Sequence, residues 1–160
     1  CTNYLNMLYK INNYPATILR LFLVYGPKQN NNKIVSHTII NCLLNKKFNL
    51  SKGNQKRDYC YIEDVTRSIF SALKSKTKGE IINIGSGKPL TVRSLVKYIQ
   101  KLVGRGKPIF GALNYRKYEN MKVYPNIEKA TKKLHWRPKI SLEKGIKLTI
   151  NYYKNFLKVA

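Results

Sequence analysis

Acidic residues are scarce in this chain of 160 residues, which has 7 Asp and Glu against 31 Lys and Arg, and only 2 His. Asp58, Glu63 and Asp64 lie close together in sequence, but no histidine or further carboxylate accompanies them. Metal sites and paired acid–base carboxylates need several such groups. We therefore expect no metal site and no catalytic carboxylate pair in this segment.

Cysteine is equally sparse. Cys1, Cys42 and Cys60 are odd in number, far apart and without CxxC spacing, which argues against a disulfide framework and a zinc site. The chain also lacks Ser-His-Asp, Cys-His and HExxH arrangements. No run approaches the roughly 18 apolar residues of a membrane span, and no signal segment opens the chain. We expect a cytoplasmic protein without a membrane partner.

The scarcity of acids leaves a formal net charge of +24. Such an excess suits a nucleic-acid or anionic-membrane partner. The lysines, however, are scattered, with short clusters only at Lys46-Lys47 and Lys132-Lys133, and Asn, Ile and Tyr are also plentiful, as an AT-rich coding sequence would produce. We therefore expect no nucleic-acid partner, and keep a basic nucleic-acid-binding module as the alternative function.

Apolar periodicity predicts strands that alternate with helices, which favours an α/β fold with parallel pairing. The predicted helices are 1–13, 34–44, 65–74 after an Asp64 cap, a helix from the Thr91 cap to Gly104 and Gly106, 127–134 with Asn126 as cap, and a last helix capped by Ser141. The predicted strands are 16–25, buried on both faces, then 80–84, 107–110, and a possible pair of 48–50 with 57–62 around the turn 51–56.

Two short segments carry candidate site chemistry. Arg57 stands where a strand begins, and a guanidinium there can take two oxygens of a phosphate or carboxylate. The alternative is a structural ion pair with Asp58, Glu63 or Asp64. Gly85-Ser-Gly87 follows a strand but lacks the third glycine of a dinucleotide fingerprint, so we interpret it as a tight turn.

Five blocks in this order resemble the extended short-chain dehydrogenase/reductases, the NAD-dependent epimerases and dehydratases of nucleotide sugars. They are Arg20-Leu-Phe-Leu-Val-Tyr-Gly-Pro27, Gln55-Lys-Arg-Asp-Tyr-Cys-Tyr-Ile-Glu-Asp-Val65, Asn83-Ile-Gly-Ser-Gly87, Tyr124-Pro-Asn-Ile-Glu-Lys-Ala130 and Leu134-His-Trp-Arg-Pro138.

The resemblance implies the last part of a Rossmann-type parallel sheet plus a small α/β substrate-binding domain. Residues 1–27 would end the NAD-binding domain, and 28–160 would be mainly the substrate-binding domain, with 80–87 a strand returning to the Rossmann sheet. In the family, the Gly-rich cofactor loop and the catalytic Tyr-xxx-Lys pair come earlier in the chain. We therefore expect a C-terminal half whose N-terminal Rossmann half is missing, with no catalytic residue of its own.

The resemblance also assigns roles to residues. Arg57 and Arg116 correspond to arginines that hold the nucleotide's phosphates. Glu119 replaces the Asp that holds the ribose, and Leu23 stands where many members have Asn. Lys33 is a further substrate-binding candidate. The last two expected contacts, Leu21 and Phe22, would lie near the nicotinamide of NAD.

The implied function is NAD-dependent epimerisation or dehydration of a nucleotide-activated sugar. The implied assembly is a homodimer of the full-length protein. A non-catalytic family member that binds a nucleotide remains a further alternative.

Overall fold

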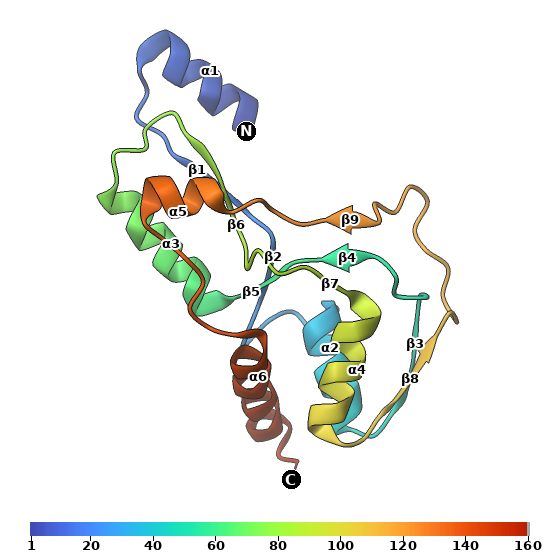
Figure 1. Cartoon of the computed structure of the whole chain (residues 1–160). Helices are drawn as coiled ribbons and strands as arrows, with labels where there is room; N and C mark the ends of the chain where they lie inside the picture. Colours follow the sequence, from blue (N-terminus) through green and yellow to red (C-terminus); the bar gives the residue numbers. More distant parts are fainter. Residues whose placement is uncertain (160) are drawn as a thin grey trace. The chain divides into compact units, whose positions relative to one another are not determined.

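The computed structural model describes residues 1–159, whose contacts group them into two compact units. The first unit comprises residues 1–24, 58–87 and 124–140, and the second comprises 25–57, 88–123 and 141 onward. Each unit is therefore assembled from segments that are far apart in the sequence, as the colours of Figure 1 show.

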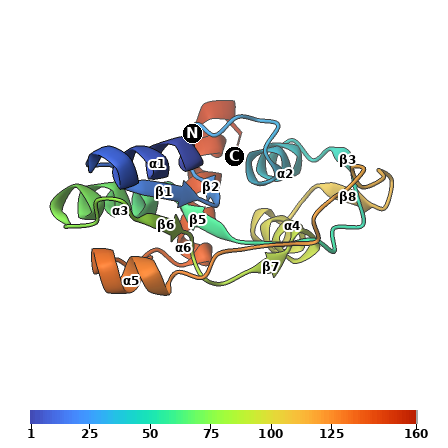
Figure 2. The same ribbon diagram turned by 90° about the horizontal axis from the view of Figure 1, so that it is seen from above.

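The first unit contains a parallel pair of strands. β1 (Ile18–Leu21) pairs in parallel with β6 (Ile81–Ile84), and β2 (Leu23–Tyr25) pairs with β5 (Tyr59–Tyr61). Its helices are α1 (Thr2–Asn12), α3 (Ile62–Lys74) and α5 (Glu128–Leu134). Figure 2 shows α1 and α5 on opposite sides of β1 and β6. The buried core consists of Cys60, Val65, Ile82, Ile84, Ala130, Leu134 and Trp136.

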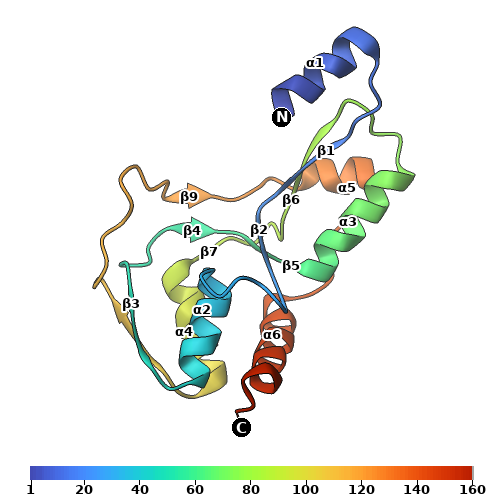
Figure 3. The same ribbon diagram turned by 180° about the vertical axis from the view of Figure 1, so that it is seen from behind.

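The second unit packs three helices against each other, namely α2 (Ile34–Leu43), α4 (Val92–Val103) and α6 (Leu142–Leu157) (Figure 3). β3 (Lys47–Leu50) pairs in parallel with β8 (Lys107–Phe110). A small sheet has the order β7 (Leu90–Thr91), β4 (Lys56–Arg57), β9 (Lys122–Val123). This small sheet carries Arg57.

Apolar periodicity and capping residues in the sequence predicted the helices and several of their ends. The six predicted helices are present, and the α/β class is confirmed. Thr91 Oγ1 accepts the Ser94 N–H at 3.0 Å, and Ser141 Oγ accepts the Lys144 N–H at 3.2 Å, as N-caps do. Gly104 ends α4 with a φ of 78°, which glycine adopts without steric cost.

The predicted strand 16–25 is present but interrupted. Phe22 separates β1 from β2, and its N–H donates to the Ile84 carbonyl at 3.0 Å. The prediction of burial on both faces is wrong for this chain, because Leu21 and Leu23 are 47% and 42% exposed. Within residues 1–159, β1 has β6 as its single hydrogen-bonded neighbour, so part of its surface stays uncovered.

The suggested pairing of 48–50 with 57–62 is wrong. β3 pairs with β8, β4 pairs with β7 and β9, and β5 pairs with β2. The carbonyls of Gly53 and Gln55 accept the N–H groups of Arg93 and Val92, which lie at the start of α4. The first N–H groups of a helix have no partner within that helix, so the turn docks on α4 instead of closing a hairpin.

Two predicted helix caps are displaced. α3 begins at Ile62 after Tyr61, so Asp64 lies inside the first turn and is not the N-cap. Its carboxylate is fully buried and bonds to a distant segment described below. The N-cap of α5 is Ile127, although Asn126 Oδ1 does accept the Glu128 N–H at 2.8 Å.

Residues 1–159 lack two features that would indicate other functions. No helix there has the length and apolar character needed to cross a membrane. No group of three or more His, Cys, Asp or Glu side chains in the same residues could hold a metal ion.

Candidate functional site

Arg57 lies on β4, the central strand of the small sheet in the second unit. Its neighbours in register are Leu90 on β7 and Val123 on β9. Its Nη1 donates to the Lys56 carbonyl at 2.8 Å, and its Nη2 forms an ion pair with the Glu119 carboxylate. The side chains of Arg57 and Glu119 are only 14% and 19% exposed. The guanidinium is therefore held in one orientation in a largely desolvated setting, where charge-assisted contacts are strong.

The partner of Arg57 is not one of the three carboxylates near it in sequence. The structure pairs it with Glu119, which is 62 residues away. This is an ion pair between two predicted site residues, so it joins the phosphate candidate and the ribose candidate in one cluster. Local sequence could not show it, because the contact depends on β9 lying beside β4.

The carboxylates of Asp58, Glu63 and Asp64 do not contact Arg57. Asp58 is buried, and its two oxygens accept the Ser86 N–H at 2.6 Å and the Ser86 hydroxyl at 2.9 Å. This contact fixes the Gly85-Ser-Gly87 turn, as the interpretation of a tight turn requires. A Cβ at Gly85 would lie 2.5 Å from Pro125, so the close approach needs glycine. Glu63 is exposed on α3.

Asp64 anchors the segment that follows α5. Its carboxylate pairs with Arg67 and accepts the N–H groups of Lys139 and Ile140 at 2.8 and 2.9 Å. The Trp136 indole N–H donates to the Asp64 backbone carbonyl at 3.0 Å, and Trp136 is buried. Asp64 is thus a structural residue, and Trp136 belongs to the buried core of the first unit.

Arg116 is exposed in the turn that presents Glu119, whose N–H donates to the Arg116 carbonyl at 3.0 Å. The turn thus brings Arg116 into the same loop as the partner of Arg57. Lys33 is exposed at the N-cap of α2, and its carbonyl accepts the His37 N–H at 2.8 Å. The structure leaves the Lys33 side chain at the surface of the second unit.

The remaining predicted residues belong to the first unit. Leu21 ends β1 and Leu23 begins β2, and both are exposed, whereas Phe22 between them is half-buried. They form a short apolar segment at a junction between strands. The phosphate candidates and these apolar candidates thus lie in different units.

Gln55 is a further candidate residue, to which the sequence assigned no role. Its side-chain Oε1 is buried, and within the described part of the chain it has no hydrogen-bond partner. Buried polar atoms are usually paired, so an orphaned acceptor two residues before Arg57 suits a ligand that brings an N–H or O–H donor. Tyr115 was also missed; its hydroxyl accepts the Asn54 N–H at 3.0 Å and ties the loop before Glu119 to the turn before β4.

Other reactive side chains are poorly suited to chemistry. Burial raises the pKa of Cys42 to about 11 and that of Cys60 to about 12, so both thiols stay protonated at neutral pH and are poor nucleophiles. Burial lowers the pKa of His37, which packs edge-on against Phe48. Tyr118 and Lys122 have Tyr-xxx-Lys spacing, but Tyr118 is 90% exposed in a turn; only a helix would place residues at this interval on one face.

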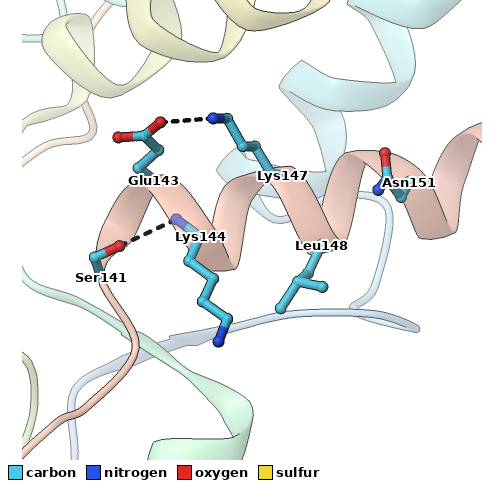
Figure 4. A pocket seen from close by; sticks show the side chains of 6 residues that line it. All are labelled: Ser141, Glu143, Lys144, Lys147, Leu148 and Asn151. Atoms are coloured by element: carbon cyan, nitrogen blue, oxygen red, sulfur yellow. Dashed lines mark hydrogen bonds and ion pairs between the residues drawn. The ribbon is translucent and has the colours of Figure 1, made fainter.

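A separate shallow cavity of about 320 Å³ lies along α6 and is lined by Ser141, Glu143, Lys144, Lys147, Leu148 and Asn151 (Figure 4). Glu143 and Lys147 pair with each other at 2.6 Å. None of the predicted site residues lines it, so it is not part of the Arg57 cluster.

The sequence model of the NAD dependent epimerase/dehydratase family matches residues 3–85. The chain belongs to this family. The match spans more than half of the residues, including β1, β2, Arg57 and β6. The predicted family and the partial Rossmann-type α/β fold are therefore confirmed.

Known relatives agree with this assignment to the epimerase/dehydratase family. The chain is 32% identical over 145 residues to UDP-glucuronate 4-epimerase of Thermodesulfobacterium geofontis, covering 89% of this chain and 44% of that protein. It is 31% identical over 147 residues to human dTDP-D-glucose 4,6-dehydratase, covering 88% and 42%. The crystal structure of UDP-glucose 4-epimerase from Thermotoga maritima with UDP-glucose matches with a TM-score of 0.91 at 32% identity, covering 98% and 51%. The chain thus spans about half the length of these relatives.

Proposed function

We propose that this chain is the nucleotide-sugar-binding portion of an NAD-dependent epimerase or dehydratase. The observation that carries the proposal is the Arg57–Glu119 pair on the small sheet, with the unsatisfied Gln55 oxygen close to it in sequence. A fixed guanidinium matches the paired oxygens of a diphosphate. Glu119 and Gln55 supply acceptors for ribose hydroxyls or base N–H groups. The substrate class is therefore a nucleoside diphosphate sugar.

In this proposal Arg57 and Arg116 hold the diphosphate, Glu119 faces the ribose, and Lys33 and Leu23 contribute to the sugar side. The binding energy of the non-reacting nucleotide can then orient the sugar for reaction. Residues 1–27, with the strand 80–87, would belong to the NAD-binding domain, and the rest mainly to the substrate-binding domain.

The residues present fit only part of an NAD site. The exposed Leu21 and the adjacent Phe22 offer an apolar surface suited to a flat nicotinamide ring. NAD, when bound, would supply transient oxidation of the sugar, and the protein would supply position and electrostatics. We propose that Leu21 and Phe22 contact the ring edge. The Gly-rich phosphate loop and the Tyr-xxx-Lys pair would come from elsewhere in the polypeptide.

This proposal predicts that residues 1–160 alone turn over no UDP-, dTDP-, CDP- or GDP-sugar. Several large apolar side chains on α1 and α3 are exposed, including Tyr4, Ile11, Phe70 and Leu73 at 60–77%. Apolar surface on this scale favours association, so we also expect the isolated chain to aggregate. The assay compares residues 1–160 with the full natural polypeptide that contains them, with NAD added to both.

Turnover by residues 1–160 alone would contradict the assignment as a binding portion. If the full polypeptide binds a nucleotide sugar without converting it, the non-catalytic alternative is correct.

The full polypeptide should form a homodimer in the cytoplasm. In the proposal, α1 packs against a partner subunit, and its exposed Tyr4, Met7 and Ile11 lie at helical spacing on one side. Sedimentation of the full polypeptide at micromolar concentration checks this expectation. A monomer under those conditions would refute it.

A further inference from the structure

The turn after α2 and the turn after α4 lie side by side in the second unit. Lys46 lies in the turn after α2 and Arg105 in the turn after α4, Lys101 lies in the last turn of α4, and Lys47 and Lys107 begin β3 and β8; all five are exposed. We name these five residues the cationic corner. We propose that the cationic corner binds the phosphate backbone of a nucleic acid, as a function separate from the nucleotide-sugar site.

Two hydrogen bonds hold the two turns of the cationic corner together. The Lys107 N–H donates to the Lys46 carbonyl at 3.0 Å, and the Gly106 N–H donates to Asn45 Oδ1 at 3.1 Å. A Cβ at Gly106 would lie 2.6 Å from the Cα of Cys42, so the second turn packs tightly on the end of α2. The basic side chains therefore project from a fixed backbone, which reduces the ordering cost of binding.

The charge of the corner is not balanced by carboxylates in the segments around it. Residues 25–57 and 88–118 contain no Asp or Glu, yet they hold about half of the Lys and Arg of the chain. The second unit has two carboxylates among its described residues, Glu119 and Glu143, and these pair with Arg57 and Lys147. The sequence showed scattered lysines; the fold concentrates positive charge in one unit.

The positions of Lys47 and Lys107 favour binding of an anion. They face each other in register across the parallel pair β3–β8, and both are exposed. Two ammonium groups held on neighbouring strands repel each other. A phosphate group placed between the two ammonium groups would remove this repulsion.

The corner suits nucleic acid better than a membrane surface. Membrane-surface anchors combine cations with several apolar side chains that insert between lipids. Ile109, paired with Asn49 on β3–β8, and Leu44 at the end of α2 are both exposed, so two apolar side chains accompany five basic ones. A nucleic acid offers consecutive phosphates to several cations at once, and each contact releases counterions.

The test measures binding of the full natural polypeptide to an oligodeoxyadenylate of about 20 nucleotides at several salt concentrations. About five single-strand phosphate contacts predict a log–log slope near −3.5, or about 100-fold weaker binding at about 200 mM than at about 50 mM salt. Replacing Lys46, Lys47 and Lys107 by Gln should lower the magnitude of the slope by about 2. Arg replacements at the same positions should keep it. UDP should not compete, because the Arg57 cluster is a different site.

The matched control replaces Lys74, Lys76 and Lys78 by Gln, which removes the same charge from exposed positions of the first unit. We expect this control variant to show the same log–log salt slope as the unmodified protein. An equal loss in both triple variants would show that bulk charge alone is responsible and overturn the proposal. So would undetectable binding at low salt, equal binding of polyglutamate, or tighter binding of anionic vesicles.

Discussion

Replacing Asp64 by Ala should lower the free energy of unfolding by about 3–5 kcal/mol, the range seen when one partner of a buried charged contact is removed. The Asp64 carboxylate is fully buried and accepts two backbone N–H groups, from Lys139 and Ile140. Hydrogen bonds to a charged group contribute about 1.5–3 kcal/mol each. Without the carboxylate, the segment after Trp136 loses its attachment to α3.

The measurement is urea unfolding of the full natural polypeptide, in which a shift of the midpoint at constant slope reports stability. Asp64→Asn keeps one acceptor oxygen and should lose about half as much. Glu63→Ala is the matched control, since Glu63 occupies the same helical turn but is exposed. If Asp64→Ala and Glu63→Ala differ by less than about 0.5 kcal/mol, the anchoring role is wrong.

Asp64 also shows what the sequence could predict and what it could not. An acidic residue before an apolar run is a common start of a helix, which explains the N-cap prediction. The true partners of its carboxylate are backbone groups 75 and 76 residues later, and no local pattern reveals them. In contrast, Thr91 and Ser141 cap through N–H groups three residues away, so sequence alone identified them.

The same distinction explains the strands. Single strands follow from composition, but partners depend on the tertiary fold. Residues 48–50 and 57–62 are separated by a Gly turn that would suit a hairpin. The carbonyls of this turn instead accept N–H groups at the start of α4. β3 pairs with β8, which begins at residue 107. The candidate site behaves likewise: Arg57, Arg116 and Glu119 were identified by resemblance, whereas the direct pairing of Arg57 with Glu119 required the structure.

Replacing Arg57 by Ala in the full polypeptide should weaken nucleotide-sugar binding by about one to two decades. The guanidinium is oriented by Glu119 and the Lys56 carbonyl and can donate parallel hydrogen bonds to phosphate oxygens. A charge-assisted contact is worth about 1.5–3 kcal/mol, and each 1.4 kcal/mol is about tenfold in affinity. Arg57→Lys should recover only part, because an ammonium cannot donate in a bidentate fork.

Titration of UDP-glucose, UDP-glucuronate and dTDP-glucose by calorimetry measures this effect, and NAD binding should be nearly unchanged. Lys56→Ala is the matched control, because Lys56 is the adjacent residue of β4, is exposed, and successive side chains of a strand point to opposite faces. We expect Lys56→Ala to change affinity by less than about twofold. In kinetics, loss of a contact that is equally strong in the ground state and the transition state raises KM and leaves kcat unchanged.

A Glu119 variant tests whether Arg57 and Glu119 bind the ligand together or form only a structural ion pair. Residues in direct contact have non-additive effects when mutated, so Arg57→Ala should cost less affinity in a Glu119→Gln background if the two act together on the ligand. Arg116→Ala should weaken binding too, since Arg116 belongs to the loop that presents Glu119. Suppose instead that Arg57→Ala leaves nucleotide-sugar affinity within about twofold but lowers the urea midpoint. Arg57 would then serve to hold the 116–119 turn against β4, and the diphosphate would have to be bound by other residues.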